Sequence, residues 1–240
     1  MDQPRRHCEC GGGWAAKIGN GVLSHLAQDL SRRGVAVYNV EYRRVGTGGG
    51  WPTTFTDALY AYRTASTLHR RWPQLSATRM VVAGHSAGAQ LAALPAMPSA
   101  RHLLRLGDAA DPYPRAFVSL AGAVNLRREA FAGRSTVIAA LGGVPAAVPD
   151  RYDTVDPIGR ISPFVRTILV HGTADRVVPY ALADEFYPDA NDRHTRPELI
   201  PVVGGSHTSL VNHRSRRAYL DSLTAILSAT KSGSMGKTVR

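Results

Sequence analysis

The stretch around residues 79–93 constrains the fold more than any other part of this 240-residue chain. A short apolar run leads into Gly-His-Ser-Ala-Gly at residues 84–88, and an alanine- and leucine-rich helical pattern follows directly. A strand, a tight turn and a helix in this order place the central serine on a strained turn, where glycines remove side chains that would collide. The helix then directs its N-terminal N–H groups at an oxyanion formed there. We predict that Ser86 is a nucleophile rather than an incidental serine in a glycine-rich turn.

Length and composition are those of one sizeable domain. At 44% hydrophobic residues, the chain can bury a substantial core. We expect one domain over residues 1–228, a cap-like insertion at about 125–163 and a polar tail at 229–240. The sequence has no apolar run long enough for a membrane span and no secretory signal at its start. Cys8 and Cys10 are too close for a useful disulfide and make a poor zinc site. We therefore predict a reduced, cytoplasmic protein.

The net charge of +11 raises the question of nucleic-acid binding. Nearly all of the positive charge is arginine, in doublets scattered along the chain. Nucleic-acid binders usually concentrate such charge on one stripe with interleaved aromatic residues, and no such cluster is visible. We expect no nucleic-acid partner, although the charge can attract small anionic ligands.

Strands alternate with helices along most of the chain. This order predicts an α/β fold with a mainly parallel sheet and helices on both faces. The loop at 43–52 is expected to be flexible and without chemistry, and Thr53 or Thr54 to cap the helix after it. Besides the helix that follows Gly-His-Ser-Ala-Gly, we predict strands at 35–42, 79–84, 116–120, 167–171 and 198–203, and helices at 20–33, 53–71, 181–187 and 215–227.

Two further residues complete a catalytic set with Ser86. Asp175 and His207 each come just after a predicted strand, and groups at the carboxyl ends of parallel strands converge. A serine hydroxyl needs a histidine to take its proton, and the histidine needs a carboxylate to fix its tautomer. The alternatives are a turn-forming aspartate and an ordinary loop histidine. We expect His213 to be a reserve base and His171 to be structural, and the remaining candidates to be surface or turn residues: Asp153, Asp156 and Asp184.

These segments, taken together, resemble the α/β-hydrolase superfamily. Gly11-Gly12-Gly13-Trp14 and Glu41-Tyr42-Arg43 are similar to the esterase/lipase branch with an HGGG-type motif. This branch includes carboxylesterases, acetyl-xylan or feruloyl esterases and kynurenine-formamidase-like enzymes. The resemblance implies an oxyanion hole made by backbone N–H groups of Ala87, Gly12 and Gly13. It implies no metal ion and no organic cofactor.

Two departures from that family lie at the N-terminus. Cys10 stands where a histidine normally precedes the glycines. The preceding residues, 4–9, are too polar to predict a buried strand, although the family has a strand there, between those at 35–42 and 79–84. We therefore expect the first strands to be missing and the chain to be an N-terminally shortened hydrolase.

The predicted function is that of a serine hydrolase that cleaves small carboxylic esters through an acyl-enzyme. Its partner is then a small-molecule ester or amide. A close variant is an aryl-formamide amidase, and a non-catalytic, truncated hydrolase-fold protein is the alternative from another class. The sequence leaves the substrate and the oligomeric state open.

Overall fold

The structure, a computed structural model, describes residues 5–10, 13–15, 20–105, 111–186 and 197–231, the first range by its backbone alone. Its centre is a six-stranded sheet in the order β2-β1-β3-β4-β5-β6, in which all five neighbouring pairs are parallel. The predicted parallel α/β fold is therefore confirmed. The strands are β1 Arg5–Cys10, β2 Val35–Asn39, β3 Val81–His85, β4 Ala116–Leu120, β5 Arg166–Gly172 and β6 Glu198–Val202.

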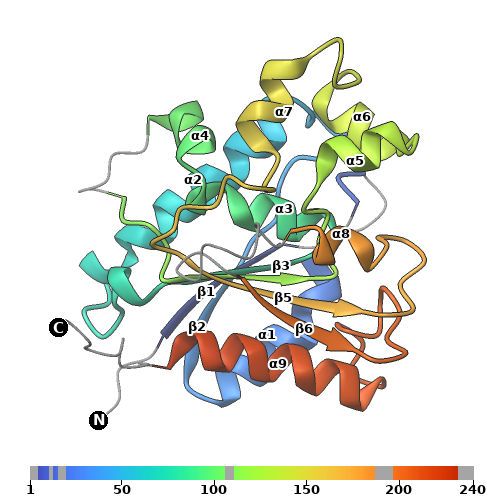
Figure 1. Cartoon of the computed structure of the whole chain (residues 1–240). Helices are drawn as coiled ribbons and strands as arrows, with labels where there is room; N and C mark the ends of the chain where they lie inside the picture. The colour runs from blue at the N-terminus through green and yellow to red at the C-terminus, as the bar shows by residue number, and fades with distance from the viewer. Residues whose placement is uncertain (1–4, 11–12, 16–19, 106–110, 187–196, 232–240) are drawn as a thin grey trace, which may run out of the picture.

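Helices cover both faces of the sheet (Figure 1). On one face α1 (Ser24–Arg32) and α9 (Arg216–Thr230) enclose an apolar core that includes Leu30, Val118 and Ile226. On the other face lie α2 (Thr53–Thr67) and α3 (Ala87–Ala93). Every residue of β3 and β4 is buried, as a parallel strand covered on both faces requires. None of the helices in the described ranges is long and apolar enough to cross a membrane.

Strand β1 corrects the expectation that the strand leading into the glycine motif is missing. It lies between β2 and β3, with Arg5 opposite Val35 on one side and Cys10 opposite Gly84 on the other. The sheet is therefore continuous where we expected a gap. The prediction was wrong because it relied on side-chain polarity, whereas a parallel ladder is built from backbone N–H and C=O groups that any residue except proline supplies.

Several element ends differ from the predicted ones. The first helix begins as the 3₁₀ turn η1 (Asn20–Leu23) before α1, and α2 is followed by η2 (Leu68–Arg70). Helix α8 covers only Ala181–Asp184, and the end of the predicted helix, Tyr187, lies outside the described residues. Helix α9 runs to Thr230, so the predicted tail begins later than expected. The other short elements are η3 Ala77–Arg79, η4 Leu94–Ala96, α4 Pro98–Arg101 and η5 His102–Leu104.

The loop at 43–52, which we expected to be flexible, is closed by hydrogen bonds. The Gly49 N–H donates to the Arg44 carbonyl at 2.9 Å, and the Thr54 hydroxyl accepts from the Gly50 N–H at 2.8 Å. Thr54 therefore holds this loop rather than capping its helix through a side-chain bond.

The insertion at 125–163 folds as three short helices on the α2/α3 face (Figure 1): α5 Leu126–Phe131, α6 Ser135–Leu141 and α7 Pro149–Val155. Asp156 is fully buried and accepts hydrogen bonds from the backbone N–H groups of Leu126 (2.9 Å) and Arg127 (3.0 Å). It thereby ties the start of α5 to the end of α7, so our expectation of a surface or turn role was wrong for this residue. Asp153, paired with arginines, and Asp184 are exposed as predicted.

Candidate active site

Ser86 occupies the turn between β3 and α3, in the conformation that the sequence predicts. Its φ of 57° and ψ of −126° lie outside the regions that a non-glycine residue ordinarily adopts. The Ser86 N–H donates to the Leu120 carbonyl on β4 at 3.0 Å, which fixes the turn to the neighbouring strand. A Cβ added at Gly84 would lie 2.2 Å from the Gly88 carbonyl oxygen, so strand and helix approach as closely as the motif requires.

Asp175 and His207 meet at the carboxyl edge of the sheet. Nδ1 of His207 lies 2.8 Å from Oδ2 of Asp175. The other carboxylate oxygen accepts from the N–H groups of Val177 (2.8 Å) and Val178 (2.9 Å). The turn-forming role that we weighed as an alternative is therefore real, but Asp175 also orients the His207 ring.

Backbone contacts hold the segments that carry these two residues side by side. A Cβ at Gly172, the last residue of β5, would lie 2.2 Å from the Gly205 carbonyl oxygen. The Ala174 N–H donates to that same oxygen at 3.0 Å, and the Gly204 N–H donates to the Thr173 hydroxyl at 2.9 Å. Two glycines thus allow the aspartate turn and the histidine loop to touch.

The surroundings of Asp175 favour its ionised form. Burial by itself would raise its pKa, but hydrogen bonds from His171 and His207 outweigh burial and hold the pKa of Asp175 well below its usual range. Nε2 of His171 lies 3.4 Å from Oδ2 of Asp175 and 2.8 Å from the Val178 carbonyl oxygen. His171 is buried and supports the turn, in agreement with its predicted structural role.

The residue before Ser86 also contacts His207, and sequence reasoning missed it. Nε2 of His85 lies 2.8 Å from the His207 carbonyl oxygen, and the two rings are 4.7 Å apart between centroids. Within the described part of the chain, the Ser86 hydroxyl makes no hydrogen bond with the His207 ring. Such contacts are often longer without substrate. The three-residue triad therefore stays a prediction, with its Asp175–His207 half in contact. A polar residue at the end of a fully apolar strand was the one available signal for His85.

The predicted oxyanion residues are described in part. Gly12 lies outside the described residues. Gly13 has a φ of 41°, and the Nε1–H of the buried Trp14 donates to Oε1 of Gln90 at 3.3 Å. Gln90 belongs to α3, whose first residue is Ala87. The end of the glycine loop is therefore fixed against the helix that begins after Ser86.

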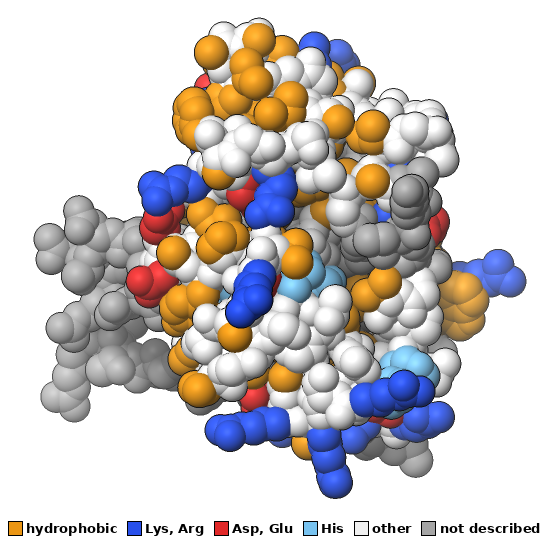
Figure 2. Space-filling view, turned by 90° about the vertical axis from the view of Figure 1, so that its right-hand side faces the viewer, with side chains coloured by type: hydrophobic (Ala, Val, Ile, Leu, Met, Phe, Trp, Pro, Cys, Tyr) orange, Lys and Arg blue, Asp and Glu red, His pale blue; other side chains and the backbone are white. Residues whose placement is uncertain are grey.

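The predicted reserve base does not join this group. His213 is exposed, and its ring lies 4.1 Å from that of His25 on α1. Figure 2 shows the face of the molecule at the carboxyl ends of the strands, where histidine atoms near the centre lie between basic and hydrophobic side chains. The described residues contain no cluster of three or more His, Cys, Asp or Glu side chains that could hold a metal ion.

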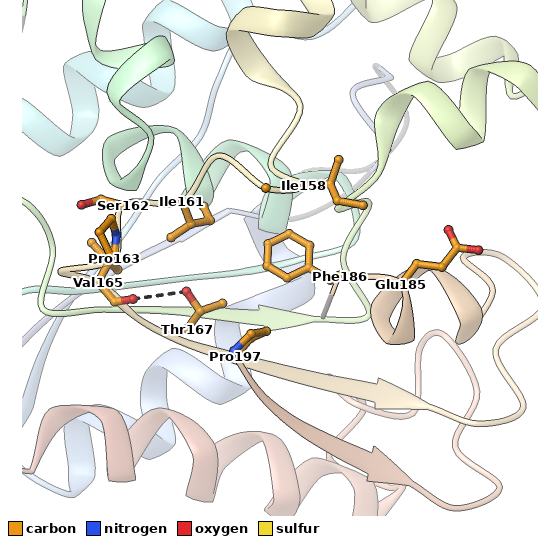
Figure 3. Close-up of a pocket in the computed structure, with 10 residues that line it drawn as sticks. Ile158, Ile161, Ser162, Pro163, Val165, Thr167, Glu185, Phe186 and Pro197 are labelled. Atoms are coloured by element: carbon orange, nitrogen blue, oxygen red, sulfur yellow. Dashed lines mark hydrogen bonds between the residues drawn. The ribbon is translucent and has the colours of Figure 1, made fainter. Parts of the chain in front are cut away.

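Three cavities border the insertion. An open one of about 500 Å³ lies between α4, η5 and α7. A second, of about 260 Å³, is lined by Ile158, Thr167 at the start of β5 and the Phe186 ring, which faces Ile158 (Figure 3). None of the residues that line these two cavities is a predicted site residue. The third, of about 190 Å³, lies between Gly13–Trp14 and α6, next to the predicted oxyanion loop.

The fold and this arrangement define an esterase-type α/β-hydrolase. The sequence model of the BD-FAE family matches residues 10–190, and the chain belongs to that family. The suspected superfamily is thus confirmed. A comparison with curated proteins finds no match.

Solved esterase structures share the fold. The thermophilic esterase Est2 of the planctomycete Thermogutta terrifontis is 21% identical, with a TM-score of 0.74 over 95% of this chain and 81% of its own. A truncated carbohydrate esterase from gut microbiota is 17% identical, with a TM-score of 0.73 over 96% of this chain and 87% of its own. A bifunctional GH43-CE protein of Bacteroides eggerthii is 22% identical, with a TM-score of 0.71 over 94% of this chain and 34% of its own.

Proposed function

We propose that the protein is a serine esterase that hydrolyses small carboxylic esters, with Ser86, His207 and Asp175 as its triad. One observation carries this proposal: His207 is oriented through Nδ1 by a buried carboxylate, at the sheet edge where Ser86 occupies a strained turn. A histidine held in this way presents Nε2 as a base, which is the state that a serine nucleophile requires.

The reaction then proceeds in two halves. Ser86 Oγ attacks the ester carbonyl while His207 Nε2 takes the hydroxyl proton, and Asp175 stabilises the imidazolium that results. The N–H of Ala87, together with N–H groups of the glycine loop, holds the oxyanion of the tetrahedral intermediate. His207 returns the proton to the leaving alcohol. Water then attacks the acyl-enzyme by the same route and releases the acid.

The cavity beside the glycine loop is the space that we propose for a short acyl group. The cavity there holds about 190 Å³, a few times the ~30 Å³ that one water molecule occupies in the liquid. The Thermogutta esterase has been solved with propionate and with butyrate bound. We therefore propose acyl groups of two to four carbons as substrates. The non-catalytic alternative loses its main support, because it rested on the missing strand and β1 is present.

Turnover of p-nitrophenyl acetate and butyrate tests this proposal. Ser86→Ala removes the nucleophile, so we expect kcat to fall by at least about 1,000-fold. Ser76→Ala, at a serine just before η3 and outside β3, is the control and keeps full activity. A fluorophosphonate probe is expected to label Ser86 in the parent and nothing in Ser86→Ala. Folded parent protein without turnover or labelling, or turnover that survives in Ser86→Ala, would contradict the proposal.

A further inference from the structure

His85 is a buried histidine that the proposed mechanism does not use. It is the last residue of β3, its exposed fraction is 4%, and Ser86 follows it directly. Within the described residues, its ring makes one hydrogen bond, from Nε2 to the His207 carbonyl oxygen at 2.8 Å, across 122 residues of sequence. The nucleophile's strand is thus bonded to the backbone of the predicted base.

The direction of this bond fixes the tautomer of His85. A carbonyl oxygen only accepts, so the hydrogen lies on Nε2 of His85 and Nδ1 carries a lone pair. Nδ1 is buried and has no hydrogen-bond partner among the described residues. A second proton would have to enter at this unpartnered atom, so the neutral ring is the form that fits the site.

The charged groups around His85 favour the same form. His207, Asp175 and His171 are the titratable side chains that act on it. Burial, and then the proximity of His207, lower the pKa of His85 to about 4. His85 therefore stays neutral near pH 7. A cation at His85 would oppose the imidazolium that the proposed mechanism forms at His207, whose ring centroid lies 4.7 Å from that of His85.

We propose that His85 is a positioning residue for His207, whose backbone it holds through Nε2–H so that the ring stays in register with Ser86. This role rests on the proposed function of the triad. Asp175, which follows β5, holds the side chain of His207. His85, at the end of β3, holds the backbone carbonyl of His207. Because His85 precedes Ser86 directly in the chain, the proposed base and nucleophile are both positioned by the same backbone segment. A displacement of about 1 Å between reacting groups costs roughly 100-fold in rate.

Three substitutions separate positioning from space filling. His85→Gln places an amide N–H near the position of Nε2 and retains the donor. His85→Leu and the more adaptable His85→Met fill the space without a donor. We expect kcat within about threefold of the parent for Gln, and a fall of about 10- to 100-fold for Leu and Met, with KM changed less than about twofold. Thermal unfolding shows which variants are folded. If His85→Leu is unfolded, His85→Met serves as the variant without a donor.

Hydrogen exchange at residues 204–209 tests the tether without using activity. We expect faster amide exchange in this loop for Leu or Met than for Gln and the parent. Folded Leu or Met variants with parental kcat, a Gln variant as slow as they are, or unchanged exchange in all variants would overturn the inference. Failure of the proposed function is distinct, because the parent itself would then lack turnover and Ser86 labelling while the exchange comparison still applies.

Discussion

Glu129 is a buried carboxylate on α5 with an incomplete set of partners. Its exposed fraction is 4%, and its Oε1 has no hydrogen-bond partner among the described residues. Nε of Arg134 lies 3.7 Å from the other carboxylate oxygen, which is longer than a hydrogen bond. Burial raises the pKa of Glu129 to about 7; Arg134 opposes this effect and Asp156 adds to it. The same Arg134 donates to the Val177 carbonyl oxygen. This hydrogen bond links the insertion to the turn that contains Asp175.

The raised pKa makes stability depend on pH. Between its ordinary pKa of 4.5 and about 7, Glu129 keeps a proton in the folded protein that the unfolded chain releases. The free energy of unfolding therefore falls as pH rises through this window. We expect Glu129→Gln to match the parent near pH 4 and to be more stable at pH 8, by on the order of 2 kcal/mol. Urea unfolding across this pH range measures the difference.

The control for this experiment is Glu198→Gln, which removes an exposed carboxylate from β6. The substitution changes the net charge of the protein by the same amount without removing a buried acid. A Glu129→Gln difference of equal size at pH 4 and pH 8 would contradict the assignment of a buried, protonated carboxyl group.

Single residues were predictable where a local motif carried them. The strained turn at Ser86 was predicted from its pentapeptide, and the meeting of Asp175 and His207 from their places after strands. His85 and Asp156 were not, because their partners lie 122 and 30 residues away in the sequence. Such contacts exist only once the sheet has assembled, and sequence patterning reports the burial of apolar residues rather than the pairing of polar ones.

At the scale of elements, a close backbone contact at a glycine occurs on both sides of the candidate site. Gly84 lies against the Gly88 backbone, and Gly172 lies against the Gly205 backbone, each with space for no more than a hydrogen atom. The first contact joins β3 to α3 and aims Ser86. The second joins β5 to the loop of His207. Both segments of the candidate site are therefore fixed by backbone contact at a strand end, which leaves little room for adjustment.

Replacing Gly84 should displace the turn between β3 and α3 that carries Ser86. In Gly84→Ala the new Cβ would lie 2.2 Å from the Gly88 carbonyl oxygen, so α3 has to move away from β3. We expect a loss of about 1–3 kcal/mol in the free energy of unfolding. We also expect kcat to fall by more than about 100-fold, because the Ala87 N–H moves with the helix.

Gly21→Ala supplies the comparison, since a Cβ at that position meets nothing within 4 Å. Urea unfolding and ester turnover, measured on both variants, separate crowding from the general effect of adding a methyl group. Equal behaviour of the two variants would show that the close approach of strand and helix is not needed.

Elements were predictable to the extent that their side chains were apolar. The runs that became β3, β4 and β5 stood out because both faces of these strands are buried. Strand β1 has no such run. The ends of helices α2 and α8 were missed for a different reason, since a 3₁₀ turn or a loop can continue the same apolar spacing beyond the last α-helical hydrogen bond.

At the scale of the whole molecule, β1 connects parts that would otherwise be separate. The order β2-β1-β3 means that β2 reaches the rest of the sheet through β1 alone. Gly13 and Trp14 follow β1 closely, and Trp14 is bonded to α3 through Gln90. Strand β1 therefore joins β2 to the rest of the sheet, and it also places Gly13 and Trp14 next to α3, the helix after Ser86.

A proline in β1 tests whether this central position is real. Cys8 is in register with Tyr38 of β2 and with Val82 of β3, so its backbone N–H belongs to a strand that is flanked on both sides. Proline removes that donor and brings a ring into the ladder, which interior strands do not tolerate. We expect Cys8→Pro to lose roughly 3 kcal/mol or more, or to fail to fold.

Cys8→Val keeps the N–H and suits a strand, so it should retain both stability and turnover. Circular dichroism melting and p-nitrophenyl ester turnover, taken together, compare the two variants. If β1 were a loose segment outside the sheet, proline and valine would give the same melting temperature and the same activity. A large difference between the two variants means instead that the polar residues of β1 supply the ladder that joins β2 to the strands of the candidate site, and that the predicted oxyanion loop depends on this ladder for its position.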